Sequence, residues 1–181
     1  THMHLGLGVG ANDAEAVLRA LPSMALRYRA HDVAARTLAR WLAQQSQVVQ
    51  VLHPALPGAP GHEHWRALCA GASGAAQDAT KEVATSDDPG LAAGLFSIIF
   101  DARYRAEQVD AFCDALRLFK IGYSWGGPIS LVVPYELAAM RSRAAPLLQP
   151  GHLVRFSIGL EAAADLQRDL QQALALALPP L

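Results

Sequence analysis

Apolar residues recur along this chain with two spacings, one typical of helices and one typical of strands. The longest helical repeat covers about residues 26–42, where apolar positions are three or four residues apart. The predicted core face is Leu26, Ala30, Val33, Ala34, Leu38, Trp41 and Leu42. The charged residues expected to face elsewhere are Arg27, Arg29, Asp32, Arg36 and Arg40. Gln44 to Ser46 should end this helix.

Shorter helices are predicted on both sides of it. Asn12 or Asp13 is expected to cap a first helix, and Pro22 should interrupt it. Residues 62–68 favour one or two helical turns, and residues 135–143 a short helix or a turn. Two later apolar stripes predict amphipathic helices. They are Val109, Phe112, Cys113 and Leu116, and then Leu166, Leu170, Ala173, Leu174 and Ala177 before Pro179-Pro180.

Short runs rich in β-branched and aromatic residues predict the strands. They cover residues 48–52, 95–100, 118–123, 129–133 and 153–158. Helices separate some of these strands, but no strict βαβ repeat is present. The expected fold class is therefore α+β, with a small, mostly antiparallel sheet and helices packed on one face.

Residues 70–93 break the pattern, because they are rich in Gly, Ala, Ser, Thr and Asp and have almost no large apolar side chain. We interpret residues 75–93 as a flexible, exposed insertion. The rest of residues 1–181 is expected to form a single domain.

Composition narrows the function classes. Apolar residues make up 52% and charged residues 17%, with a net charge of -1, so a packed core is expected and neither nucleic acid nor an anionic membrane is an expected partner. Cys69 and Cys113 lack metal-ligand spacing and are expected to be reduced thiols of a cytosolic protein. His62 and His64 would not share a helix face, so no metal site is predicted.

The candidate chemistry lies in one turn and one strand. Residues 123–127 form a glycine turn with a hydroxyl, Ser124, and an indole, Trp125, and Arg155 lies on the last predicted strand. An arginine can make two parallel hydrogen bonds to a carboxylate. From spacing alone, Arg155 could equally pair with a nearby acid, Trp125 could be a core residue and Ser124 an ordinary turn serine.

An ordered set of motifs resembles the C-terminal domain of bacterial cystathionine β-lyases, which use pyridoxal 5'-phosphate (PLP). The motifs are Leu26-Arg27 with His31, His53 to Pro57, Gly61 to Trp65, Gly94 to Ser97, Leu118 to Gly127 with Ser130-Leu131, and Val154-Arg155 with Ile158 to Glu161 and Asp165-Leu166. Trp125 in the turn favours the β-lyase branch over the related γ-synthases and γ-lyases.

The resemblance implies a substrate-binding role for Arg155, Ser124 and Trp125 and no catalytic residue in this chain. It also implies a small-molecule amino-acid substrate, PLP as cofactor and a cytoplasmic homotetramer. The parent reaction would be elimination of L-cystathionine to homocysteine, pyruvate and ammonia in methionine biosynthesis. The family's Schiff-base lysine lies in an N-terminal domain that this chain is expected to lack, since its only lysines are Lys81 and Lys120. Two alternatives stay open: another transsulfuration enzyme, and a free-standing module that binds an amino acid or a partner protein.

Overall fold

The computed structural model describes residue 6 and residues 8–69, 90–137 and 147–180. Its elements follow the order α2 (Ala11–Ala20), η1 (Leu21–Ser23), α3 (Met24–Leu42), β1 (Val48–Leu52), α4 (His62–Cys69), β2 (Leu95–Asp101), α5 (Ala106–Ala115), β3 (Lys120–Ile121), β4 (Leu131–Tyr135), β5 (Gly151–Ser157) and α7 (Ala163–Ala177). The predicted insertion at residues 75–93 and the predicted turn at residues 135–143 lie mostly outside the described residues.

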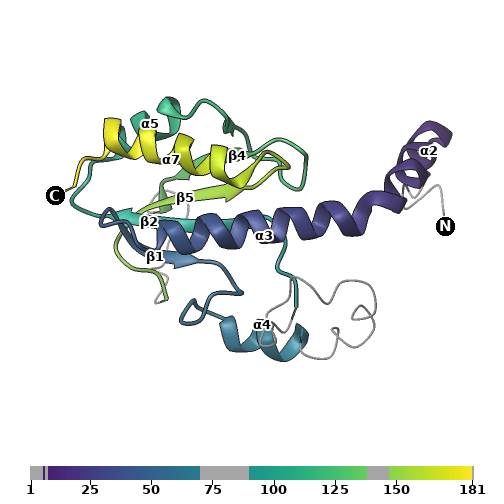
Figure 1. Cartoon of the computed structure of the whole chain (residues 1–181), viewed down its shortest axis with the longest axis horizontal. Coiled ribbons are helices and arrows are strands. Elements are labelled where there is room, and N and C mark those ends of the chain that lie inside the picture. The colour runs from purple at the N-terminus through teal and green to yellow at the C-terminus, as the bar shows by residue number, and fades with distance from the viewer. Residues whose placement is uncertain (1–5, 7, 70–89, 138–146, 181) are drawn as a thin grey trace.

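The sheet has the strand order β1-β2-β5-β4-β3. All pairs are antiparallel except β3 with β4, which is parallel. Helices α3, α5 and α7 pack on one face of this sheet (Figure 1). The predicted fold class, α+β with a mostly antiparallel sheet and helices on one face, is confirmed.

Strand alternation decides which side chains form the core. On β2, Phe96, Ile98 and Phe100 point into the layer between sheet and helices, and on β5 Val154 and Phe156 do the same. Facing them are mainly the predicted stripes of α5 and α7, together with the C-terminal two thirds of α3. The opposite sheet face is therefore left for the odd-numbered residues of β5, including Arg155.

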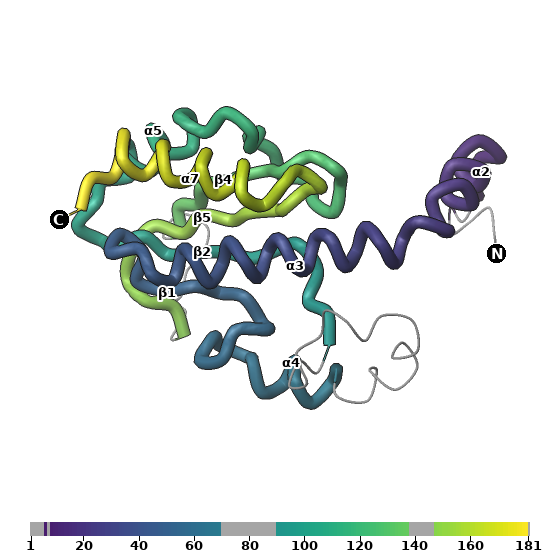
Figure 2. Tube along the Cα trace, viewed as in Figure 1, coloured from purple at the N-terminus to yellow at the C-terminus, as the bar shows by residue number. Residues whose placement is uncertain are grey.

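The predicted core face of α3 is wrong at its N-terminal end. Leu26 is 72% exposed, because this end of α3 extends beyond the sheet, with α2 at its tip (Figure 2). Val33 is 51% exposed although its neighbours Asp32 and Ala34 are buried, so it lies on the outer face of the helix. Asp32 and Arg36, expected to point away from the core, are buried. They form an ion pair of 2.9 Å between Asp32 Oδ2 and Arg36 Nε.

That buried pair anchors the chain as it enters β2. Asp32 accepts a hydrogen bond from the Ala92 N–H at 2.6 Å, and Arg36 donates to the Gly90 carbonyl. A Cβ atom on Gly90 would lie only 2.7 Å from Cys69 Cβ. The end of α4 and the chain that enters β2 therefore lie in contact.

Several element boundaries also differ from the prediction, among them those of α2, α3 and β3. Helix α2 begins at Ala11, with Gly10 as its N-cap and no side-chain cap, so neither Asn12 nor Asp13 caps it. Helix α3 ends at Leu42, before the expected stop at Gln44. Strand β3 has only two residues, because the chain around it is held by the α7 carboxylate of Asp169. This carboxylate accepts the N–H groups of Arg117 and Leu118 at 2.7–3.0 Å.

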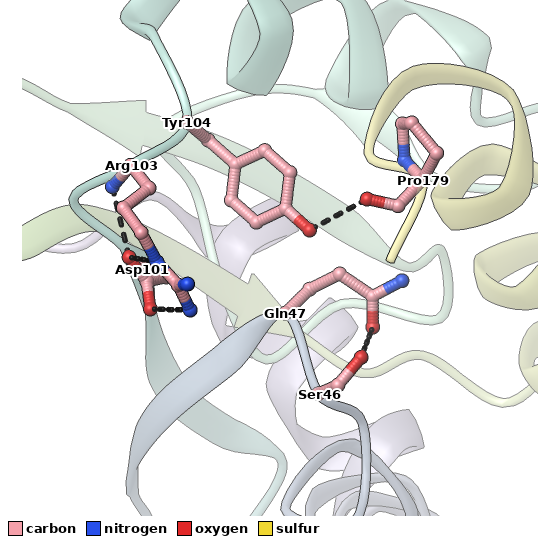
Figure 3. Close-up of polar contacts among 6 residues, drawn as sticks. All are labelled: Ser46, Gln47, Asp101, Arg103, Tyr104 and Pro179. Atoms are coloured by element: carbon pink, nitrogen blue, oxygen red, sulfur yellow. Dashed lines mark hydrogen bonds and ion pairs between the residues drawn. The ribbon is translucent and has the colours of Figure 1, made fainter. Parts of the chain in front are cut away.

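The chain just after α7 is bonded to the loops that precede β1 and follow β2, and Figure 3 shows the contact of Tyr104 with Pro179. The Tyr104 hydroxyl donates to the Pro179 carbonyl at 2.8 Å, and Gln47 Nε2 donates to the Leu178 carbonyl at 2.9 Å. Arg103 forms an ion pair with Asp101 beside them and holds the pKa of that carboxyl below its usual value, mainly through their hydrogen bonds. These contacts lie at one end of the sheet and leave the far ends of β4 and β5 to the candidate site.

Candidate functional site

Arg155 lies on the sheet face opposite the described helices α3, α5 and α7. Its backbone pairs with Ser97 on β2 and with Val133 on β4. Because its neighbours Val154 and Phe156 point into the core, the arginine side chain must project from the opposite face. The strand thus fixes the direction of the guanidinium.

The turn between β3 and β4 wraps around this guanidinium. Arg155 Nη2 donates to the Tyr123 carbonyl at 2.7 Å and lies 3.4 Å from the carbonyls of Gly122 and Ser124. A second contact comes from the same strand, where Ser157 Oγ accepts the Gly126 N–H at 3.2 Å. Gly126 has a φ of 74°, a backbone conformation that favours glycine.

Aromatic rings stand on two sides of the arginine. Its Cζ lies 6.0 Å from the centroid of the Trp125 ring and 5.8 Å from that of the Tyr135 ring. The Tyr123 ring meets Tyr135 edge-on, with centroids 6.3 Å apart. Trp125 is 65% exposed, so its indole shapes an open surface beside the cation and does not belong to the core.

The charge of Arg155 has no acidic partner within the part of the chain that the structure describes. The ion pairs found there join Arg19 to Glu15, Arg36 to Asp32, Arg103 to Asp101 and Arg168 to Asp165. The hydrogen bonds of Arg155 to described residues all use Nη2. The N–H groups of Nε and Nη1 have no partner among these residues and can donate to an anion.

The three predicted binding residues are brought together. Arg155, Ser124 and Trp125 lie close together, and Ser124 contributes its carbonyl, since its hydroxyl has no hydrogen bond to another described residue. Sequence reasoning gave no role to Ser157 or Tyr135, which complete the surroundings of the guanidinium. Spacing contained a signal for Ser157, since residues two apart on a strand share a face. Nothing in the sequence indicated that Tyr135 pairs across from Leu153.

Histidines of the resemblance motifs make structural contacts. His31 Nδ1 lies 2.6 Å from the Ile158 carbonyl, His53 Nδ1 accepts the Ala55 N–H at 3.1 Å, and His62 Nδ1 lies 2.8 Å from the Pro54 carbonyl. In the described ranges, no three His, Cys, Asp or Glu side chains gather closely enough to hold a metal ion. Likewise, none of the described helices combines the length and the apolar character needed to cross a bilayer.

The described residues that surround Arg155 do not make a complete PLP site, because they include no lysine for the cofactor. The one lysine in the described ranges, Lys120, donates from Nζ to the Arg117 carbonyl at 2.8 Å. Lys81 lies outside the described residues. The site can therefore bind an anionic group through Arg155 and the turn, but it offers no lysine for a covalent bond to the cofactor.

Comparison with known proteins gives the family and the relatives of the chain. A family model described as Cys/Met metabolism PLP-dependent enzyme matches residues 1–175. Cystathionine beta-lyase MetC of Escherichia coli (strain K12) is 34% identical over 174 residues, which cover 94% of this chain and 39% of that protein. L-alanine/L-glutamate racemase of Wolbachia pipientis wMel is 31% identical over 175 residues, which cover 97% of this chain and 38% of that protein.

A solved structure extends the likeness to three dimensions. Cystathionine gamma synthase from Xanthomonas oryzae pv. oryzae, in complex with aminoacrylate and cysteine, superimposes with a TM-score of 0.69 at 28% identity. The match covers 98% of this chain and 41% of that one. The chain thus spans about two fifths of the length of these relatives.

Proposed function

The chain belongs to the Cys/Met metabolism PLP-dependent enzyme family, and from this premise we propose that it is the C-terminal, substrate-side domain of a carbon–sulfur lyase resembling cystathionine β-lyase. The whole enzyme would convert L-cystathionine to homocysteine, pyruvate and ammonia. Relatives named cystathionine β-lyase support this reaction, and so does the position of Trp125 beside Arg155.

One observation carries the proposal, namely a guanidinium with two nitrogens not used by described residues, on the sheet face opposite α3, α5 and α7. Arg155 uses Nη2 for the turn, and none of the described acids pairs with it. A carboxylate oxygen that accepts from Nε or Nη1 would make a charge-assisted hydrogen bond, which is stronger than a neutral one. Ser124 and Trp125 would then border the bound amino acid, and fixing its carboxylate would orient the bonds at Cα for reaction.

The cofactor side of the reaction is assigned to another part of a longer protein. PLP, when bound, supplies an electron sink for the bonds at Cα. The described residues around Arg155 include no lysine that could bind PLP. We therefore place the Schiff-base lysine in an N-terminal domain. We further propose that the whole enzyme is a cytoplasmic homotetramer.

A second candidate is a related transsulfuration enzyme of the γ-synthase or γ-lyase type. The fold match to cystathionine gamma synthase favours it. A substrate panel on the whole protein separates the two, since a β-lyase releases pyruvate from L-cystathionine, whereas a γ-synthase makes cystathionine from cysteine and an activated homoserine.

Calorimetric titration of the 181-residue chain with L-cystathionine tests the binding role. Replacing Arg155 by Gln should weaken binding about 10- to 100-fold, because a hydrogen-bonded ionic contact contributes about 1.5–3 kcal/mol. The matched control is Arg103→Gln, since Arg103 already has its own acid, Asp101. Equal binding by wild type and R155Q, or none by wild type, would remove the proposal.

The assignment of the lysine has its own test. The chain alone should neither eliminate L-cystathionine nor give a PLP absorbance band that borohydride fixes. Robust turnover by the 181-residue chain together with such a band would show that the cofactor lysine lies within it. That result would also favour Lys81 or Lys120 as the reactive group.

A further inference from the structure

Four hydrogen bonds join the end of the Trp125 turn to the chain that follows β5. Glu161 accepts from Ser130 twice, from the N–H at 2.9 Å and from the hydroxyl at 2.8 Å. Ser130 Oγ in turn accepts the Gly159 N–H at 2.8 Å, and the Leu160 N–H donates to the Pro128 carbonyl at 2.8 Å. We call this set of contacts the Ser130–Glu161 clip.

The clip is closely packed as well as hydrogen-bonded. Ser130 is fully buried and Gly159 is buried. A Cβ atom on Gly159 would lie 2.6 Å from the Ser130 nitrogen and even closer to the Pro128 oxygen and the Glu161 carboxylate. Two of these three neighbours are backbone atoms, which cannot move aside as a side chain could. Residues 128–130 and residues 159–161 are therefore held at a fixed distance from each other.

This separation sets the distance between Trp125 and Arg155. The turn leaves β3 at Ile121 and reaches the clip at Ser130, and most of the residues between them are exposed. Apart from the clip, the described contacts of the turn are those with Arg155, the bond from Gly126 to Ser157, the bond from the Gly122 N–H to the Val132 carbonyl and the ring contact of Tyr123 with Tyr135. Arg155 and Glu161 follow each other closely along one chain, so moving the clip moves the turn across the guanidinium.

We propose that Ser130 and Glu161 are positioning residues, which hold Trp125 and the Tyr123 carbonyl in the places where Arg155 can bind a carboxylate. The inference rests on the proposed function for the role of Arg155, but it assigns a task to residues that touch no substrate. A purely structural clip would stabilise the fold without changing the relation between the indole and the cation.

Fluorine NMR of the chain labelled with 5-fluorotryptophan separates these two roles. Trp41, Trp65 and Trp125 give three resonances, and Trp125→Phe identifies the third. When Arg155→Lys is the only substitution, it should shift the Trp125 resonance, because the guanidinium carbon lies 6.0 Å from that ring. In S130A this shift should fall to less than half, and in E161Q, which keeps one acceptor oxygen, it should fall by a smaller fraction.

The matched control is Asp169→Asn, since Asp169 is also a buried carboxylate that accepts backbone N–H groups. It lies on α7 and holds residues 117 and 118, outside the clip. D169N should lower stability yet leave the Trp125 shift caused by R155K unchanged. If S130A does not fold, E161Q alone decides.

The inference is overturned if the response of Trp125 to R155K is unchanged in folded S130A and E161Q, or if D169N reduces it equally. Its failure is distinct from failure of the proposed function. If wild type does not bind L-cystathionine while the fluorine response depends on the clip, the positioning role stands and the substrate assignment falls. If wild type binds, S130A should bind about tenfold more weakly.

Discussion

A histidine buried in the core should make this protein lose stability in mild acid. His53 has no solvent exposure, and its ring lies 5.9 Å from that of Phe96. Nδ1 accepts the Ala55 N–H, whereas Nε2 has no hydrogen-bond partner among the described residues. Burial, and then the charges of Arg36 and Arg40, lower the pKa of His53 from 6.5 to about 4.

The direction of the effect follows from proton binding. Between pH 6.5 and about pH 4 the unfolded chain binds a proton at His53 that the folded chain does not, so acid favours unfolding. The contribution of the neutral ring is complete above pH 6.5 and is lost as the pH falls toward 4. These pKa values give a loss of about 2 kcal/mol between pH 7 and pH 5, and of about 3 kcal/mol in all.

Urea unfolding at pH 7, 6 and 5 measures this loss. His53→Asn keeps an oxygen that can accept the Ala55 N–H but cannot titrate, so its free energy of unfolding should fall by about 2 kcal/mol less than that of the wild type. The control is His64→Asn, because His64 is exposed and should leave the wild-type pH dependence unchanged. Parallel pH profiles for wild type and H53N would refute the reasoning.

Other predictions concern packing and reactivity. Gly159→Ala should destabilise the fold by about 1–3 kcal/mol, because its new methyl group meets backbone atoms of the clip; an unchanged thermal midpoint would contradict this. Tyr104→Phe should cost about 1 kcal/mol in urea unfolding, since it removes the bond to Pro179, and a loss within error of zero would count against that contact. Burial, and then the charges of Asp110 and Asp114, raise the pKa of Cys113 to about 12. At pH 8 a thiol reagent should therefore modify Cys69 well before Cys113. Equal rates in the folded protein would contradict the burial of the Cys113 thiol.

Much of the fold could be predicted from local pattern. The strand residues alternate or run apolar, and the stripes of α5 and α7 match their buried faces. The face of α3 was predicted wrongly because helical periodicity shows which residues are apolar, not where the sheet ends. A buried ion pair such as Asp32–Arg36 also looks like surface charge in sequence, since its partners, residues 90 and 92, are far along the chain.

The sequence indicated which residues form the candidate site but not the contacts that hold them in place. Glycines, an indole and a lone arginine indicated which two segments matter, and the structure brings those segments together. The roles of Ser157, Tyr135 and the Ser130–Glu161 clip depend on strand register and on contacts about 30 residues apart. Such long-range pairing depends on the whole sheet and does not appear as a periodic pattern of residues in the sequence.

The contact between Cys69 and Gly90 brings together two positions that are about twenty residues apart in the sequence. Because Asp32 and Arg36 hold the chain at Gly90 and Ala92, the two ends of the connection between residues 69 and 90 are fixed close together. Doubling such a connection costs only about 0.6 kcal/mol in closure entropy. A variant with a longer connection between residues 69 and 90 should therefore lose little stability through closure entropy.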